Sequence, residues 1–245
     1  LFEAVATGKV GFAILPIESS HAGTIQPILD RLAASELRII GEYRYSEPLC
    51  LLALPGATVG SIREICSHPD LLAQAGEYIE KTFGDRVSLR IGGNSATCAA
   101  QLKESGAKES AVIAGPRAGR LYGLEILARD VAGTVFPPTT RYLMVSRDSV
   151  VPERYLEPKT SFAVTLRNSP GALFKAMACF AMRDININKV DTRPTKAADK
   201  SFRPWEYVLY VDVDGSPATD PAVARAVAQL EEFAVKVKVL GSYPR

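Results

Sequence analysis

A chain of 245 residues is long enough for one or two domains with buried cores, and its 47% hydrophobic and 23% charged residues are typical of a globular protein. Its formal net charge is only +2, without basic blocks or interleaved aromatic residues, which argues against a nucleic-acid surface. No apolar run approaches the length needed to span a bilayer, and no charged-then-apolar leader opens the chain. We therefore expect a small molecule as the partner.

The cysteines stand apart at positions 50, 66, 98 and 179 without a Cys-x-x-Cys pair, and only His21 and His68 could join them. This pattern supports neither a zinc site nor a disulfide framework. We expect free thiols in a reducing compartment, and no bound metal.

The first elements are expected to be a helix end over residues 1–8, a strand over 10–15 and a helix that begins near Thr24. The continuous apolar run at 10–15 predicts a strand covered on both faces. Glu18 and Ser19 follow it in a polar loop, at the strand end where such folds place ligand groups. The alternative is a solvated loop that caps the helix.

Strands are expected next over residues 37–45, 49–54 and 62–66. Ser67 and Asp70 have the spacing of a capping box, with Pro69 in the first turn of a helix that would run to about residue 83. His68 is then interpreted as a helix-start residue rather than a general base.

A strand over 87–91 leads through two glycines into Asn94, Ser95, Ala96 and Thr97, followed by a helix. A glycine turn that feeds a helix start offers backbone N–H groups and short polar side chains to an anion. The alternative is simple capping by Asn94 or Ser95.

A strand over 111–114, a helix over 117–122 and a segment over 124–131 lead to the sequence PPTTRY at residues 137–142. Thr139, Thr140 and Arg141 open a strand there, and an Arg fork beside hydroxyl groups suits a small anionic substrate that loses or gains water. The alternative is an exposed strand edge without a ligand. The alternation of short strands and helices predicts an α/β domain with its site in the crevice between sheet halves.

A polar segment with prolines at 152 and 158 marks a boundary, which divides the chain into a domain over 1–147, a linker over 148–159 and a domain over 160–245. The second domain has strands over 160–167, 185–193, 205–213 and 235–240, and helices that begin at Pro170 and Ala222. Leu173, Met177, Phe180 and Ala181 are expected to point inward. This βαββαβ order is the ferredoxin-like arrangement.

The motifs LPIESS (15–20), SHP (67–69), YGL (122–124), TRY (140–142), GAL (171–173), DTRP (191–194) and LGSYP (240–244) resemble, in order and spacing, those of prephenate and arogenate dehydratases. The resemblance implies a two-subdomain, periplasmic-binding-protein-like catalytic domain followed by an ACT domain, the amino-acid sensor of that family. Residues 51–56 and 180–189 look closest to plant-type arogenate dehydratases, which implies the plastid stroma in a plant or alga and the cytoplasm otherwise.

The implied activity is a lyase that removes carbon dioxide and water, converting arogenate to L-phenylalanine or prephenate to phenylpyruvate, without a cofactor. By position in the family motifs, Thr140 would assist departure of the ring hydroxyl and Arg141 would bind a carboxylate. The other implied substrate-side residues are Thr139, Glu18, Ser19, Ser67, Asn94, Ser95 and Thr97.

The resemblance also implies that L-phenylalanine regulates the enzyme, at a pocket between two ACT domains of a homodimer or homotetramer. The residues expected to line this pocket are Asn168, Pro170, Gly171, Ala172, Leu173, Asn186, Ile187 and Asn188.

The chain departs from the family pattern at Ser19, Pro138, Tyr142, Asp191 and Thr192, and the family's opening Gly-Pro-x-Gly-Thr segment does not precede Leu1. Two other functions stay open: a non-catalytic amino-acid-binding protein, and a regulatory subunit that assembles through its ACT domain. The sequence does not separate arogenate from prephenate.

Overall fold

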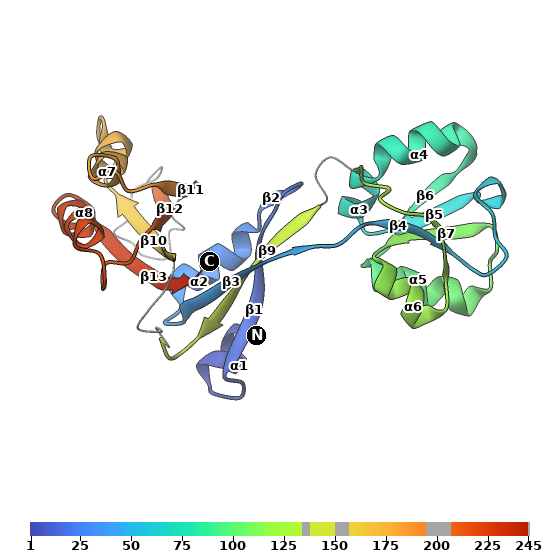
Figure 1. Ribbon diagram of the computed structural model, residues 1–245, viewed down its shortest axis with the longest axis horizontal. Coiled ribbons are helices and arrows are strands. Elements are labelled where there is room, and N and C mark those ends of the chain that lie inside the picture. Colours follow the sequence, from blue (N-terminus) through green and yellow to red (C-terminus); the bar gives the residue numbers. More distant parts are fainter. Residues whose placement is uncertain (134–137, 150–156, 195–206, 245) are drawn as a thin grey trace. The chain divides into compact units, whose positions relative to one another are not determined.

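The computed structural model describes residues 1–133, 138–149, 157–194 and 207–244 (Figure 1). Three β-sheets with helices packed on them make the protein a mixed α/β fold. The chain forms two compact units: the first contains Leu1–Ile17, Ile25–Tyr43 and Arg141–Arg245, and the second contains Glu18–Thr24 and Arg44–Thr140. Pro137, residues 150–156 of the expected linker and the first two residues of the strand expected at 205–213 lie outside the described residues.

The N-terminal elements form a four-stranded sheet in the order β2-β1-β9-β3. Its strands are β1 (Phe12–Ser19), β2 (Gly23–Thr24), β3 (Arg38–Ser46) and β9 (Thr139–Ser146), accompanied by α1 (Phe2–Ala6) and α2 (Gln26–Ala34). The expected helix end, strands and second helix are thus confirmed, although Ile25 rather than Thr24 precedes α2 as its N-cap residue.

Strand β1 differs from its prediction in two ways. Its burial alternates, because Ala13, Leu15 and Ile17 are buried whereas Phe12 and Ile14 are 54% and 51% exposed. Only one face of this strand is therefore buried, although its apolar residues lie on both faces. The strand also extends through Glu18 and Ser19, which pair with Thr24 and Gly23 of β2; these residues belong to a hairpin and not to a loop.

The C-terminal elements are β10 (Pro158–Leu166), α7 (Ala172–Ala181), β11 (Ile187–Pro194), β12 (Tyr207–Asp214), α8 (Pro221–Glu231) and β13 (Lys236–Pro244). They confirm the expected βαββαβ order, and β10 begins two residues before the expected domain start. All neighbouring strands of the sheet, ordered β11-β12-β10-β13, are antiparallel.

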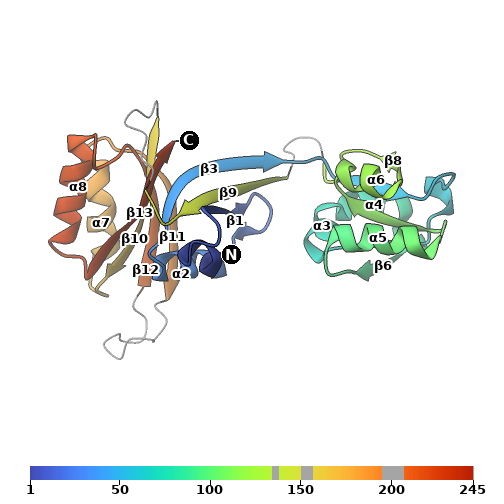
Figure 2. The ribbon, with the colours of Figure 1, turned by 90° about the horizontal axis from the view of Figure 1, so that it is seen from below.

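Helices α7 and α8 lie together on one face of this sheet (Figure 2), over a core that includes Phe162, Phe180, Val211 and Leu230. Leu173 and Ala181 were expected to point inward, but both are exposed, Leu173 by 49%. The buried residues of α7 are Ala176, Cys179 and Phe180. The inward stripe of α7 is therefore displaced from the predicted one.

The other face of the C-terminal sheet shares a core with the first sheet. Ala163, Tyr210, Leu240 and Tyr243 pack with residues of β1, β3, β9 and α2. The contact is close at Gly241, where an added Cβ would lie 2.2 Å from the carbonyl oxygen of Ile39. The C-terminal domain and part of the N-terminal domain thus fold as one compact unit.

The second unit contains a five-stranded sheet in the order β6-β5-β7-β4-β8, with helices on both faces (Figure 1). Its strands are β4 (Cys50–Ala53), β5 (Glu64–Ser67), β6 (Ser88–Ile91), β7 (Ser110–Ala114) and β8 (Glu125–Ala128), and its helices are η1 (Val59–Ser61), α3 (Pro69–Gln74), α4 (Gly76–Phe83), η2 (Gly84–Arg86), α5 (Ser95–Ser105) and α6 (Pro116–Tyr122). Strands β6, β5 and β7 run parallel, whereas β4 is antiparallel to β7 and β8.

The helix expected from Ser67 to about residue 83 is two helices, α3 and α4, which meet at Ala75. The N-cap of α3 is His68 and not Ser67, because His68 Nδ1 accepts the backbone N–H of Asp70 at 3.2 Å. The interpretation of His68 as a helix-start residue is confirmed. Within the described part of the chain, no helix has the length and apolar character of a membrane span.

Candidate functional site

The start of β9 is held by a loop from the N-terminal hairpin. The backbone N–H of Ser20 donates to the carbonyl oxygen of Thr139 at 2.9 Å, and the N–H of Thr139 donates to Ser20 Oγ at 3.0 Å. Both Thr139 and Thr140 are half-buried. Successive side chains of a strand point to opposite sides, so the hydroxyls of Thr139 and Thr140 face different surroundings.

A cavity of about 170 Å³ lies beside this strand start, within the second unit. Its walls are Ser20, His21, Gln74, Ala132 and Pro138. The Oε1 atom of Gln74 is buried and has no hydrogen-bond partner among the described residues. A buried acceptor without a donor is costly, so this atom is suited to receive a hydrogen bond from a ligand.

Glu18 and Ser19 lie in the hairpin that carries Ser20. Ser19 Oγ accepts the backbone N–H groups of His21 and Ala22 at 3.3 and 3.4 Å, which fixes the turn. The expected place of Glu18 and Ser19 near a substrate stays a prediction. Their local role is to shape the loop that bounds the cavity.

Ser67 is the last residue of β5. It is fully buried, and its hydroxyl donates to the carbonyl oxygen of Ile113 at 2.5 Å. The hydroxyl thus joins β5 to β7 inside the sheet, and the expected contact of Ser67 with a substrate stays a prediction.

The start of α5 carries Asn94, Ser95 and Thr97. Asn94 Oδ1 accepts the backbone N–H of Thr97 at 2.8 Å, so the capping alternative is confirmed for Asn94. Asn94 and Thr97 are exposed and Ser95 is half-buried. Beneath them, Cys66 Sγ and Cys98 Sγ lie 2.9 Å apart, and burial raises the pKa of Cys66 to about 12.

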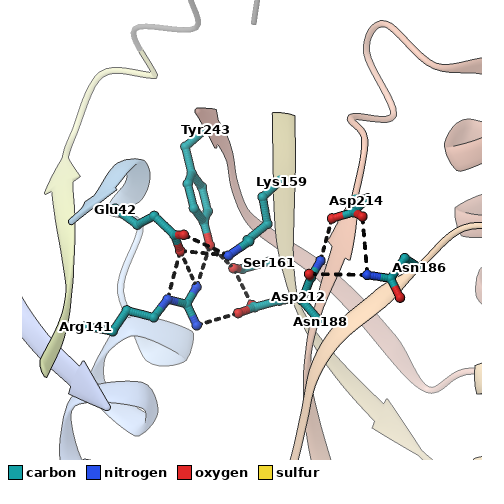
Figure 3. A network of polar contacts seen from close by, with 9 residues as sticks. All are labelled: Glu42, Arg141, Lys159, Ser161, Asn186, Asn188, Asp212, Asp214 and Tyr243. Carbon is teal, nitrogen blue, oxygen red and sulfur yellow. Dashed lines mark hydrogen bonds and ion pairs between the residues drawn. The ribbon is translucent and has the colours of Figure 1, made fainter. Parts of the chain in front are cut away.

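Arg141 lies in a buried ionic network within the first unit (Figure 3). Its Nε and Nη2 atoms each lie 2.8 Å from Glu42 Oε2, and its Nη1 lies 2.7 Å from Asp212 Oδ2. Nη2 also donates to the hydroxyl of Tyr243 at 3.0 Å. Lys159 Nζ completes the network with contacts of 2.8 and 2.9 Å to the two oxygens of Glu42.

The network is electrostatically balanced and almost dry. The side chains of Arg141, Glu42, Asp212 and Lys159 are 11%, 5%, 10% and 2% exposed. Burial acts to raise the pKa of Glu42, but the hydrogen bond from Lys159 and the charge of Arg141 outweigh it, and the pKa is lowered. Burial likewise opposes the charged form of Arg141, and the carboxylate of Asp212 leads the contacts that raise its pKa instead.

These contacts show which groups of the protein hold Arg141, and its expected binding of a substrate carboxylate stays a prediction. The guanidinium that was to bind a substrate carboxylate binds two carboxylates of the protein itself, at least four of its five N–H groups being engaged. Because Arg141 directly follows Thr140, the sequence suggested that both residues contact one ligand. Adjacent residues of a strand point to opposite faces, however, so their side chains lie in different surroundings.

A larger cavity, of about 370 Å³, lies at the start of α7 within the C-terminal domain. Its lining includes Asn168, Gly171, Ala172 and Leu173 of the expected effector segment, together with Thr192 and Tyr207 of the sheet. Asn186 and Asn188 lie instead with Asp214, since the amide of Asn188 donates to Asp214 Oδ1 at 2.5 Å and that of Asn186 to Oδ2 at 3.3 Å (Figure 3). Within one chain, Asn168, Gly171, Ala172 and Leu173 thus line this cavity, whereas Asn186 and Asn188 do not.

Sequence reasoning missed Gln74, Glu42 and Asp212. Gln74 was expected in the middle of one long helix, whereas it is the last residue of the short helix α3. Glu42 and Asp212 lie within predicted strands, and carboxylates are seldom buried unless they are paired, so neither was expected in a buried network. No cluster of potential metal ligands occurs among residues that the structure describes.

Comparison with known proteins places these features in a family. The family model described as prephenate dehydratase matches residues 1–150. The chain is 36% identical to arogenate dehydratase/prephenate dehydratase 2, chloroplastic, of Arabidopsis thaliana and 37% identical to arogenate dehydratase 2 of Petunia hybrida. Each match covers 99% of this chain, but 64% and 63% of the relatives, so the chain spans less than two thirds of their length.

Two solved structures share the fold. Prephenate dehydratase of Arthrobacter aurescens, in complex with L-Phe, superposes with a TM-score of 0.86 at 33% identity, over 99% of this chain and 78% of that one. GqqA, described as a novel type of quorum quenching acylase, gives 0.83 at 30% identity, over 99% and 85%. The match of the family model over more than half of the chain settles the assignment: this chain belongs to the prephenate dehydratase family.

Proposed function

We propose that the chain carries a decarboxylating dehydratase activity that converts arogenate to L-phenylalanine, prephenate to phenylpyruvate, or both. The reaction expels carbon dioxide and water from a cyclohexadienyl acid, and aromatisation supplies its driving force. The protein needs to hold the substrate and to assist departure of the ring hydroxyl, a task for positioned hydrogen-bonding groups.

The observation that carries this proposal is the polar cavity beside the start of β9. Thr140 lies two residues after Pro138, which lines the cavity, and its hydroxyl is the proton donor we assign to the departing hydroxyl. The unpartnered Oε1 of Gln74 would accept a hydrogen bond from a substrate hydroxyl or ammonium group. At about 170 Å³ the cavity is smaller than typical small-molecule sites of ~300–1,000 Å³, so it suits one end of the substrate.

The test is the turnover of arogenate and prephenate by the natural protein and by matched threonine variants. Thr140→Val should lower kcat by roughly 10²–10⁴, the usual contribution of a positioned proton donor. Thr140→Ser should retain most of the activity, and Thr139→Val should change it by a few-fold only, because its side chain faces the other side of the strand.

Two outcomes would contradict the proposal. A damaging Thr139→Val with a silent Thr140→Val would show that the register assigned to the strand is wrong. A protein that releases an amine from an N-acyl amide, and forms neither phenylalanine nor phenylpyruvate, would be an acylase on the same fold. Comparing the rates on arogenate and prephenate also decides the preferred substrate.

We further propose that residues 158–244 form an ACT domain that binds L-phenylalanine at the cavity beside α7. The cavity volume of about 370 Å³ lies within the range of small-molecule sites, and α7 begins without a side-chain cap. The Asn186–Asn188 segment would reach this ligand from a second copy. Phe174 of α7 and Met182, its C-cap residue, are 76% and 80% exposed, which is consistent with such an assembly.

Isothermal titration of the protein with L-phenylalanine, together with sedimentation analysis, tests this part. We expect heat of binding and a change in oligomeric state at millimolar ligand or below. Binding without turnover would identify an amino-acid-binding protein, and neither heat nor a change of state would leave the domain a structural role. If the source is a plant or an alga, we propose that the protein acts in the plastid, as the chloroplastic names of its relatives suggest.

A further inference from the structure

The ionic network joins elements from both ends of the first unit. Glu42 belongs to β3 and Arg141 to β9, whereas Lys159, Asp212 and Tyr243 belong to the C-terminal strands β10, β12 and β13 (Figure 3). The prephenate dehydratase family model matches residues 1–150. Lys159, Asp212 and Tyr243, which help to fix Arg141 and Glu42, therefore lie outside the matched residues.

Each charge in this network is needed by the others. Two cations, Arg141 and Lys159, balance two carboxylates, Glu42 and Asp212, in an environment with little water. Asp212 is itself oriented, because Ser161 Oγ donates to its Oδ1 at 2.5 Å and also lies 2.7 Å from the Tyr243 hydroxyl. A buried charge that loses its partner leaves the remaining charge uncompensated, which is strongly unfavourable.

Arg141 is the residue directly after Thr140 in β9. With its guanidinium held from two sides, by Glu42 and by Asp212, the backbone of Arg141 has little freedom to rotate or to slide along the strand. The position of Thr140 is then defined by the peptide bond that joins it to Arg141. A displacement of about 1 Å at a reacting group can cost on the order of a hundredfold in rate.

We propose that Asp212 is a positioning residue of the dehydratase reaction: held by the C-terminal sheet, it binds Arg141 and thereby fixes the strand that presents Thr140. The C-terminal domain thus contributes to catalysis directly, in addition to any ligand it binds. This inference rests on the dehydratase function proposed above.

The experiment compares Asp212→Asn with a matched control, Asp30→Asn. Asp30 of α2 lies 3.2 Å from Arg193 of β11, so this ion pair also joins the N-terminal elements to the C-terminal sheet, with side chains 18% and 26% exposed. Both variants should lower the melting temperature. Only Asp212→Asn should lower kcat, by about 10–100-fold, with KM changed much less.

A gentler variant covers the case in which Asp212→Asn does not fold. Tyr243→Phe keeps the buried ring and removes only the hydroxyl that contacts Arg141 and Ser161. It should lower kcat by a few-fold, in the same direction and again with little effect on KM. The double variant Asp212→Asn/Arg141→Met should be no slower than Arg141→Met alone, because the two residues act through one contact.

The proposal is overturned if folded Asp212→Asn retains the natural kcat, if Asp30→Asn slows the reaction equally, or if the two losses in the double variant simply multiply. Failure of the function itself is distinguishable. In that case the natural protein forms no phenylalanine or phenylpyruvate, and the positioning role falls together with it.

Discussion

Helices α5 and α7 begin in similar ways in the sequence and differently in the structure. Each follows a strand through a polar turn with glycine, and each start was expected to bind an anionic group. At α5 the protein fills the position itself, because Asn94 Oδ1 accepts the N–H of Thr97. At α7 the N-cap is Gly171, in the left-handed region at φ +75°, with no side-chain cap and a cavity of about 370 Å³ beside it.

The difference shows what a helix start needs in order to serve a ligand. Helix-start N–H groups always seek an acceptor, and a nearby Asn supplies one before any ligand arrives. A glycine N-cap supplies none and also leaves room, since an added Cβ at Gly171 would meet nothing within 4 Å. The start of α7 thus has no side-chain cap in the position that Asn94 occupies at α5. Substitutions at three positions test this difference between the two helix starts.

The largest effect is expected beneath α5, at Gly92. An added Cβ there would lie 2.1 Å from Cys98 Sγ, whereas at Gly93 it would meet nothing within 4 Å. Because overpacking a closed core typically costs 1–3 kcal/mol, Gly92→Ala should lower the free energy of unfolding by about that amount. Gly93→Ala is the matched control and should change it by less than about 0.5 kcal/mol. Urea unfolding measures the free energy of unfolding of both variants. Equal losses would mean that the contact of Gly92 with Cys98 does not constrain the turn before α5.

The second effect concerns ligand binding at α7. Gly171→Val places a β-branched residue at φ +75°, where such residues are strained, and should weaken L-phenylalanine binding roughly tenfold. Gly56 has φ +79° and equally open surroundings in the second unit, so Gly56→Val controls for the backbone strain. Titration calorimetry of both variants separates the two effects. Equal weakening by Gly56→Val would place the ligand elsewhere.

The elements that sequence predicted well are those with a local signal. The βαββαβ order of the C-terminal part was recognisable because alternating strands and amphipathic helices carry their periodicity in the sequence. The place of His68 at a helix start followed from the proline and the acidic residue after it, although the capping box was assigned to Ser67 rather than to His68. The break at Ala75 was missed, because an apolar period of about 3.6 residues continued across both helices.

The site was predicted less completely, because it depends on contacts between distant residues. Arg141 and Asp212 are 71 positions apart in the sequence, and no local motif around either residue predicts that they form an ion pair. The strand that begins at Thr139 was predicted from its local pattern, and it does lie beside the hairpin of Glu18 and Ser19. The burial of the Ser67 side chain depends on how the strands of the sheet pack together. A short sequence motif carries no information about that packing.

The smallest expected effect bears on α5 itself. Loss of an N-cap side chain typically costs ~1 kcal/mol, so Asn94→Ala should lower the free energy of unfolding by about that amount, and Asn94→Ser should restore it because Ser also caps. If capping is the whole role of Asn94, the Ser variant should also keep the natural kcat/KM on arogenate and prephenate. A Ser variant that is fully stable but at least about tenfold slower would mean that the Asn94 amide touches the substrate. The α5 start would then be a ligand site after all, closed by its own cap only until the substrate arrives.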